Sequence, residues 1–389
     1  MTAPRNISPI LDGFTVGKLF SQSGNARCYW ATQNFSNLPF IVKIISLPAS
    51  SAQLDALLMN GSFAGPAEVN AYFKEQAKDI LRNVQVLRHM ATVGGFLDYD
   101  CVQVVPSEDG KGYEVYLLSP LRQTLPQQLQ RPDLSHRDVL NMALDLCAAL
   151  TMCRRSGYCY TNLKPGNVYL HSGHYHIGDL GFLPLYEIGH IPLAAQYRSS
   201  YSPPELMDGT QPINDSADVY ALGLILYQAF NGGILPGNDA VVGRLLLPPK
   251  YADYEMAQII LRACAPDPSI RWQGPEQMGR ALMMYTQRNG IRNDPVIPAI
   301  LQELAQQEEK EEFLPEKPIE ESELALVLPE VMTLHSTSRR KNTARKKWQI
   351  ALPKRKKSRN RKINKVWITI VILAVILVLE VIISIWVFS

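Results

Sequence analysis

Cysteine is sparse in this chain of 389 residues, with six in all and no C-x-x-C pair among them. That count and pattern disfavour a disulfide framework or a zinc module, so a reducing compartment fits better. The N-terminal stretch MTAPRNISPILDG also lacks the apolar run of a cleavable signal peptide. The chain does hold 46% apolar residues, with 24 Gly and 27 Pro, which is enough to bury a globular core. Its length suits one domain of about 200 to 300 residues with appendages, or two of ordinary size.

Acidic residues are missing from residues 339–365, which hold 14 Lys and Arg. The remaining 25 basic residues face 35 acidic ones in residues 1–338, so that part carries a formal charge of −10. A negative globular part repels a phosphate backbone, which argues against nucleic acid as a partner. The basic run instead predicts contact with an anionic lipid membrane.

Charged residues are almost absent from residues 366–388, a run of 23 in which only Thr369, Glu380 and Ser384 are not apolar. A helix of that length reaches about 34 Å, enough to cross a hydrocarbon core of about 30 Å. The basic run on its N-terminal side predicts a single-pass membrane protein with the N-terminal domain in the cytoplasm. A carboxylate at Glu380 is costly in lipid: it either pairs with a partner helix or is a neutral side chain without function.

Residue patterns predict strands first and helices later, which is typical of an α+β fold with two lobes. Alternating stretches predict strands at 14–20, 26–32, 39–45, 96–105 and 113–118. Apolar residues at 3.6-residue spacing predict helices at 67–90, 136–156, 216–231, 254–264 and 275–288. From Glu303 to Glu330 there are ten Glu, two Lys and three Pro, a composition that predicts a disordered linker.

A segment in the middle of the chain carries the most specific pattern. It reads Tyr160-Thr161-Asn162-Leu163-Lys164-Pro165-Gly166-Asn167, then a hairpin turning at Ser172-Gly173, then Gly178-Asp179-Leu180-Gly181. In this order and at this spacing, the segment resembles the H-R-D-L-K-P-x-N loop and the D-F-G element of protein kinases. The resemblance implies a bilobal protein-kinase fold, with an N-terminal lobe at 10–119 and a C-terminal lobe at 120–292. Beyond it we expect an acidic linker at 293–338, the basic segment at 339–365 and the transmembrane helix at 366–388.

Two stretches before this segment extend the resemblance. Phe40-Ile41-Val42-Lys43 is similar to the V-A-I-K strand, whose lysine grips nucleotide phosphates. The stretch from Ser21 to Cys28 takes the place of the family's G-x-G-x-x-G-x-V loop. Ser21, Ser23 and Ala26 stand where the family has glycine, with Gly24 between them. Backbone amides can still face phosphates there, but the side chains hinder the close approach that glycine allows.

Three residues after the central segment are expected to hold the C-terminal lobe together. Glu205 ends a Pro-Pro-Glu that resembles A-P-E, and Asp218 opens a D-V-Y-A-L-G that resembles D-x-W-S-x-G. Arg271 is the residue that the resemblance pairs with Glu205.

The main departure from the family is Asn162, which stands where the catalytic aspartate would be. An amide can orient a substrate hydroxyl but cannot take its proton, and loss of a general base commonly costs about 10² to 10⁴ in rate. Tyr160 and Thr161 replace the His and Arg of the same motif, so switching through a phosphorylated loop is not expected. His136-Arg137-Asp138 does not supply the missing motif, because Ser135 and Asp138 form the capping box of a helix.

The acidic partner of Lys43 is left open by the sequence. The apolar rhythm of the helix at 67–90 places Asn83 at the family's glutamate position, and Glu75 lies two turns earlier on a similar face. The resemblance preserves Lys43, Lys164, Asn167 and Asp179, which implies ATP and Mg²⁺ as ligands, with Asn167 and Asp179 holding the metal. The alternative is that these two residues only bond the loop backbone.

Three hypotheses follow from these residues. The first is a membrane-anchored pseudokinase that binds ATP and Mg²⁺ and acts as a regulator or scaffold. The second is a Ser/Thr kinase of low turnover, and the third is a membrane-assembly component that binds protein partners and no nucleotide. The protein partner is unidentified, with Glu380 as one point of contact. A metal site at His171, His174 and His176 is disfavoured, because no carboxylate or thiolate is expected to be fixed beside them.

Overall fold

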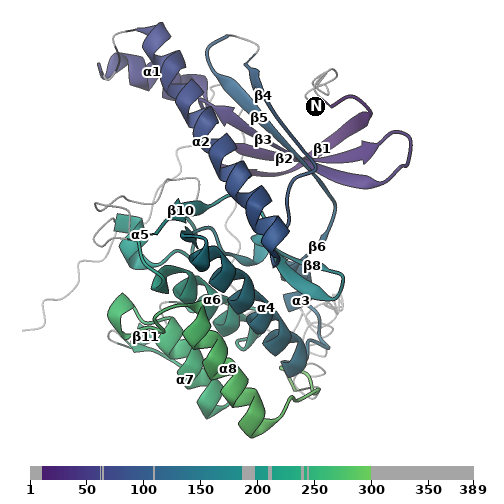
Figure 1. Ribbon diagram of the computed structural model, residues 1–389, viewed down its shortest axis with the longest axis vertical. Helices are drawn as coiled ribbons and strands as arrows, with labels where there is room; N and C mark the ends of the chain where they lie inside the picture. The colour runs from purple at the N-terminus through teal and green to yellow at the C-terminus, as the bar shows by residue number, and fades with distance from the viewer. Residues whose placement is uncertain are drawn as a thin grey trace, which may run out of the picture. The chain divides into compact units, whose positions relative to one another are not determined.

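The N-terminal lobe is built on a five-stranded antiparallel sheet in the order β1-β2-β3-β5-β4 (Figure 1). The computed structural model describes residues 11–298 except 62, 64, 108–109, 186–197, 209–212, 238–240 and 243–244. The strands are β1 (Phe14–Ser23), β2 (Ala26–Gln33), β3 (Pro39–Leu47), β4 (Cys101–Pro106) and β5 (Tyr113–Pro120). The predicted strands at 14–20, 26–32, 39–45 and 113–118 are confirmed, and each is slightly longer than predicted.

The predicted strand at 96–105 is wrong in its first half. Phe96 forms only an isolated bridge to Ile177, and β4 begins at Cys101. Between them Asp98 binds Arg88 at 2.7 Å and accepts the N–H of Tyr99 at 2.7 Å. A side chain that bonds the local backbone competes with a ladder, so the chain turns here before it enters the sheet.

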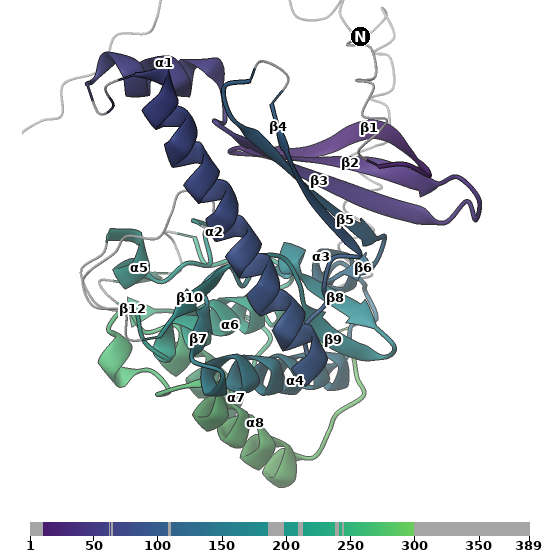
Figure 2. The same cartoon turned by 45° about the horizontal axis from the view of Figure 1, so that its top comes forward.

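Helix α2 (Pro66–Val93) lies along one face of the sheet, and its C-terminal end approaches the C-terminal lobe (Figure 2). It confirms the helix predicted at 67–90. Its buried side chains are Val69, Phe73, Ala77, Ile80, Val84, Leu87 and Met90. Gly95 follows it in a left-handed conformation, so close to the next lobe that an added Cβ would lie 2.6 Å from the Cβ of Ala149. A glycine is therefore needed where α2 leads into the C-terminal lobe. The shorter α1 (Ser51–Met59), which was not predicted, buries only Leu54.

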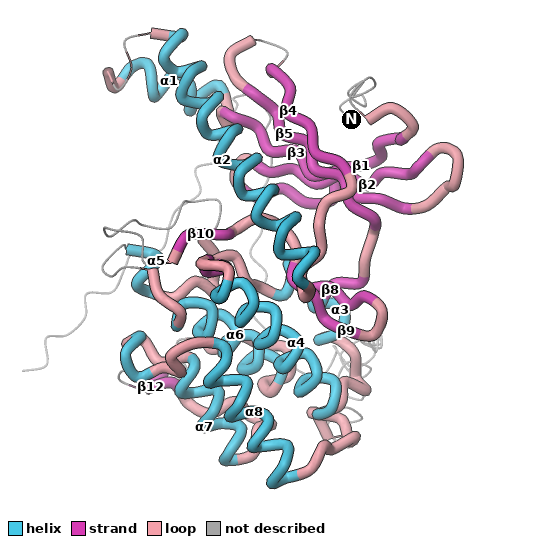
Figure 3. The backbone as a smooth tube through the Cα atoms, in the orientation of Figure 1, coloured by secondary structure: helices cyan, strands magenta, loops and turns pink. Residues whose placement is uncertain are grey.

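The C-terminal lobe is mainly helical (Figure 3). Its helices are α3 (Leu125–Leu129), α4 (His136–Arg155), α5 (Pro204–Asp208), α6 (Ser216–Ala229), α7 (Tyr254–Ala263) and α8 (Pro275–Asn289). Its short strands are β6 (Gln123–Thr124), β7 (Tyr158–Tyr160), β8 (Val168–His171), β9 (His174–Ile177), β10 (Phe182–Pro184), β11 (Val241–Val242) and β12 (Leu245–Leu246). The four predicted helices correspond to α4, α6, α7 and α8, and the predicted hairpin corresponds to β8 and β9.

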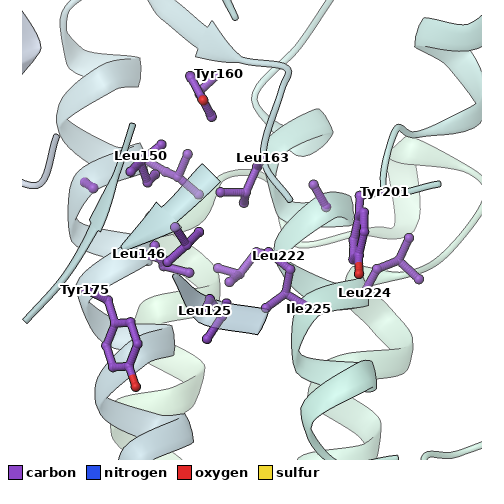
Figure 4. Packing of buried hydrophobic residues seen from close by; sticks show 14 of the residues in the cluster. Leu125, Leu146, Leu150, Tyr160, Leu163, Tyr175, Tyr201, Leu222, Leu224 and Ile225 are labelled. Atoms are coloured by element: carbon purple, nitrogen blue, oxygen red, sulfur yellow. The ribbon is translucent and has the colours of Figure 1, made fainter. Parts of the chain in front are cut away.

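Leucine and isoleucine side chains from α4, α6 and the central segment meet in the core of this lobe (Figure 4). Leu146 and Leu150 come from α4, Leu222 and Ile225 come from α6, and Leu163 comes from the segment between them. Burial of each such side chain stabilises the fold by roughly 1.5 to 3 kcal/mol. The central segment is therefore anchored in the core by the residue that follows Asn162.

Helix α4 starts where its predicted capping box lies. The Ser135 hydroxyl accepts the N–H of Asp138 at 3.1 Å, and the Asp138 carboxylate accepts the N–H of Ser135 at 3.1 Å. His136-Arg137-Asp138 is therefore the first turn of a helix and not a loop.

Residues 299–389 lie outside the described ranges. They include the predicted basic segment, the predicted span at 366–388 and all but the first residues of the predicted linker. Among the helices that the structure does describe, none combines the length and the apolar character needed to cross a membrane.

Candidate functional site

A cavity of about 330 Å³ lies between the sheet and the central segment. The sheet contributes Ser21, Ser23, Ala26, Cys28, Ile41 and Lys43, and the central segment contributes Asn162, Lys164, Asn167, Tyr169, Asp179 and Leu180. All of the predicted ligand-binding residues except Gly24 are thus brought to one cavity. Gly24, which has a φ of 56° at the β1–β2 turn, lines a neighbouring cavity instead.

Side chains at positions 160 and 161 tie the two halves of the central segment together. The fully buried Tyr160 donates its hydroxyl to the Gly178 carbonyl, and its ring packs on Phe182 with centroids 5.1 Å apart. The Thr161 hydroxyl donates to the Gly181 carbonyl at 2.9 Å. Phenol and hydroxyl groups that donate to backbone carbonyls have no charge to offer a phosphorylated loop, so these two positions are structural.

The side-chain amide of Asn162 is buried, with 3% of the residue exposed, and is held in one orientation. Its Nδ2 donates to the Leu180 carbonyl at 2.7 Å, while its Oδ1 has no hydrogen-bond partner. Gly181 lies against it, since an added Cβ at 181 would be 2.4 Å from the Asn162 Cβ. Asn167 donates its own Nδ2 to the Asn162 carbonyl at 2.8 Å. The position of the family's base therefore presents a fixed acceptor that carries no negative charge.

Asp179 adopts a left-handed backbone conformation, with a φ of 70°, and its carboxylate is fully engaged. Lys43 Nζ donates to both carboxylate oxygens at 2.6 Å. The Tyr99 hydroxyl donates to Oδ1 at 2.7 Å, and the Leu180 N–H donates to the same oxygen at 2.8 Å. Burial alone would raise the pKa of Asp179, but the Lys43 charge and these donors hold its pKa below the usual value. The carboxylate is therefore ionised and paired at neutral pH.

Neither of the two candidate partners from α2 pairs with Lys43. Glu75 is exposed and binds Lys78 at 2.6 Å on the same helix. Asn83 accepts the N–H of Gly181 at 2.9 Å and donates to the Phe182 carbonyl at 2.7 Å. Asn83 therefore fixes the segment after Asp179, and the salt bridge of Lys43 is with Asp179 itself.

The cavity has an excess of positive charge. Lys43, Lys164 and Arg122 line it, and Asp179 is the one carboxylate among the described lining residues. Burial lowers the pKa of Lys164, although the Asp179 charge opposes that shift. Burial raises the pKa of the Cys28 thiol, which faces Lys43 across the β2–β3 ladder. A ligand with several negative charges is what such a cavity attracts.

The C-terminal lobe contains the predicted pair of Arg271 and Glu205. Two hydrogen bonds of 2.7 and 2.9 Å join the guanidinium to the carboxylate, and Arg271 is completely buried. Asp218 accepts the N–H of Tyr160 at 2.9 Å and so fixes the start of the central segment. Burial raises the pKa of Asp218 to about 7.

The histidine cluster at the β8–β9 hairpin does have a carboxylate beside it, contrary to expectation. His174 Nδ1 lies 3.2 Å from Asp145 Oδ1, and the other oxygen of Asp145 accepts the N–H of Tyr175. Across the described residues, no three His, Cys, Asp or Glu side chains gather closely enough to hold a metal ion.

Comparison with known proteins supports the resemblance on which these positions rest. The family described as the protein kinase domain matches residues 72–242, a range that holds Asn162, Asn167 and Asp179. By this match, residues 72–242 are a protein kinase domain. This kinase domain is 29% identical to a Wee1-like protein kinase of Oryza sativa subsp. japonica over 25% of this chain and 19% of that protein. It is 30% identical to NUAK family SNF1-like kinase 2 of Rattus norvegicus over 26% of this chain and 16% of that protein.

A third relative of the kinase domain is the probable serine/threonine-protein kinase glkA of Dictyostelium discoideum, 24% identical over 36% of this chain and 30% of that protein. The alignments therefore span less than a third of the length of each of these curated relatives. Lys43 lies before the matched range, so its position in the cavity is known from the structure alone.

Proposed function

We propose that this protein is a pseudokinase: it binds ATP with Mg²⁺ and acts as a regulator or scaffold instead of transferring phosphate efficiently. The observation that carries the proposal is the fixed amide of Asn162, whose Nδ2 donates to the Leu180 carbonyl. The oxygen left over can accept a hydrogen bond from a substrate hydroxyl, but an amide does not become a base by accepting one. Asp179 cannot take over that role while Lys43 and Tyr99 hold it.

The cavity retains groups suited to a nucleotide with its metal. Lys43 and Lys164 supply positive charge for phosphates. The Asp179 carboxylate and the Asn167 amide oxygen are hard oxygen donors, the type that Mg²⁺ prefers. The hydrogen bond of Asn167 to the Asn162 carbonyl uses its Nδ2 and not this oxygen. These two residues would hold the ion, whose role when bound is to neutralise neighbouring phosphate charges.

Two other functions compete with this one, and measurements of nucleotide binding and of phosphate transfer distinguish them from it. A low-turnover Ser/Thr kinase is favoured by the retained Lys43, Asn167 and Asp179, which can position ATP without a base. A membrane-assembly component without nucleotide is favoured by the Lys43–Asp179 pair, which satisfies the cavity's buried carboxylate without a ligand.

ATP with Mg²⁺ is expected to raise the melting temperature of the full chain in detergent, because a ligand that binds only the folded state stabilises it. At a free ATP concentration of 100 times the dissociation constant, the free energy of unfolding rises by about 2.7 kcal/mol. Lys43→Ala should abolish the shift, whereas Lys78→Ala, which removes an exposed lysine of α2, should keep it. A flat response of the wild type to ATP would favour the assembly function.

Transfer of labelled phosphate from ATP separates the other rival. We expect the wild type and Asp179→Asn to give the same background signal towards generic protein substrates and towards the chain itself. Robust transfer that disappears in Asp179→Asn would establish a kinase of low turnover in place of a pseudokinase.

The proposal includes a membrane anchor at 366–388, with the kinase domain in the cytoplasm, the basic segment 339–365 on anionic lipid and Glu380 facing a partner protein. The supporting observation is the apolar run beside a run of 14 basic residues. The full chain should stay in the membrane pellet after a carbonate wash, and a chain ending at residue 365 should be released. Release of both proteins would contradict the proposed anchor.

The partner contact at Glu380 is tested on a sizing column in detergent. Glu380→Leu should elute later than the wild type, because the complex with the partner is lost. Equal elution would contradict the partner contact.

A further inference from the structure

The two oxygens of the Asp179 carboxylate differ in the number of donors that they accept. Oδ1 accepts the Tyr99 hydroxyl at 2.7 Å, the Leu180 N–H at 2.8 Å and Lys43 Nζ at 2.6 Å. Among the contacts of the described residues, Oδ2 accepts Lys43 Nζ alone, also at 2.6 Å. A carboxylate oxygen has two lone pairs. Tyr99 and Leu180 are therefore enough to occupy both lone pairs of Oδ1.

The Tyr99 side chain is anchored in this position. On one side its backbone is held by the Asp98 carboxylate, which accepts the Tyr99 N–H at 2.7 Å. On the other side the N–H of Asp100 donates to the Leu118 carbonyl of β5 at 2.9 Å. The Tyr99 ring packs against the main hydrophobic core, so a change of rotamer would take it out of that core. The hydroxyl therefore stays on Oδ1 as long as the start of β4 keeps its place.

Lys43 differs from the other two donors because its ammonium group is carried by a flexible four-carbon stem. In the proposed function this group meets a phosphate of the nucleotide. Its departure from Asp179 would empty Oδ2 and leave Oδ1 with the Tyr99 and Leu180 contacts. A metal ion at Asp179 would then be offered one carboxylate oxygen and not two.

We propose that Tyr99 is a positioning residue that makes this cavity prefer Mg²⁺ over Ca²⁺. The inference rests on the proposed function, in which ATP and a divalent ion share the cavity. Ca²⁺ takes about six to eight oxygen ligands and can bind both oxygens of one carboxylate. Mg²⁺ keeps several of its waters and needs only one or two carboxylates together with phosphates. Because Tyr99 keeps Oδ1 occupied, Asp179 offers a single oxygen, which is sufficient for Mg²⁺ but deprives Ca²⁺ of a ligand.

The test measures by calorimetry how tightly the full chain in detergent binds ATP with Mg²⁺, with Ca²⁺ and with a chelator in place of either ion. We expect the wild type to bind ATP most tightly with Mg²⁺. In Tyr99→Phe the preference for Mg²⁺ over Ca²⁺ should fall by about tenfold, because Ca²⁺ no longer has to displace a hydroxyl from a charged oxygen. An effect of the substitution on Lys43 or on folding would change both dissociation constants alike and would cancel in their ratio.

Tyr254→Phe is the matched control, because Tyr254 is a tyrosine of α7 that is 82% exposed and lies outside the cavity, and it should keep the wild-type ratio. An unchanged ratio in Tyr99→Phe overturns the inference and leaves the proposed function standing. Loss of ATP binding with Mg²⁺ in Tyr99→Phe also overturns it, since the role of Tyr99 is then structural. Wild-type binding that does not depend on the ion overturns the inference and removes the metal, but not the nucleotide, from the proposed function. No binding of ATP under any of the three conditions overturns both.

Discussion

Replacing Arg271 with alanine is expected to lower the free energy of unfolding by about 3 to 5 kcal/mol, because it leaves the Glu205 carboxylate buried without a partner. Arg271 is completely buried, and its guanidinium also donates to the carbonyls of Ala265 at 2.6 Å and Pro266 at 2.9 Å. For a domain of this size the loss corresponds to a drop of roughly 10 °C in melting temperature. Thermal unfolding of the two proteins measures it.

Two comparisons show whether burial is the cause. Arg288→Ala breaks the exposed pair of Arg288 with Glu255, which is also 2.6 Å long, and should cost less than about 1 kcal/mol. Combining Arg271→Met with Glu205→Leu should cost less than the sum of the single changes, since neither charge is then stranded. Equal losses for Arg271→Ala and Arg288→Ala would contradict the role of the buried pair.

The second large effect concerns pH. Asp218→Asn should become more stable relative to the wild type as the pH rises, by about 3 kcal/mol between pH 4.5 and 7.5. Burial raises the pKa of Asp218 to about 7, against 3.8 for the ordinary group. Between those values the folded chain keeps a proton that the unfolded chain has released, so this group weakens the fold as the pH rises. Asparagine has no proton to lose and still offers an oxygen to the Tyr160 N–H.

Denaturant unfolding of both proteins at the two pH values gives this difference directly. Only the difference between the proteins is informative, because groups such as Asp179, whose pKa is lowered, act in the opposite direction and lose stability as the pH falls. Asp133→Asn, at an exposed carboxylate paired with Arg131, should not show the increase. A constant gap between Asp218→Asn and the wild type would mean that Asp218 is ionised in the folded protein throughout.

Much of the fold could be predicted because its signals are local. The buried residues of α2 recur every three or four positions, and the cap of α4 joins Ser135 to Asp138, three residues on. The same holds for the central segment, where a short hairpin brings Asn167 and Asp179 together, so their place in one cavity follows from spacing.

The contacts that define the chemistry of the cavity could not be predicted in this way. Tyr99 reaches Asp179 across 80 residues, and Asn83 reaches Gly181 across 98. Nothing near Tyr99 in the sequence marks it as a partner of a carboxylate. The sequence also left the partner of Lys43 open between Glu75 and Asn83, because helical spacing gives the face of a residue but not its distance to the lysine on a facing strand. Arg122 was missed because it follows β5 in the chain, and nothing in its local sequence places it beside the central segment.

Both oxygens of Asp179 are already occupied by the ammonium group of Lys43. In the proposed function, a divalent ion at this carboxylate would compete with that internal cation, and the lysine would then be able to meet a phosphate. Binding of metal and of phosphate would therefore be coupled through one side chain.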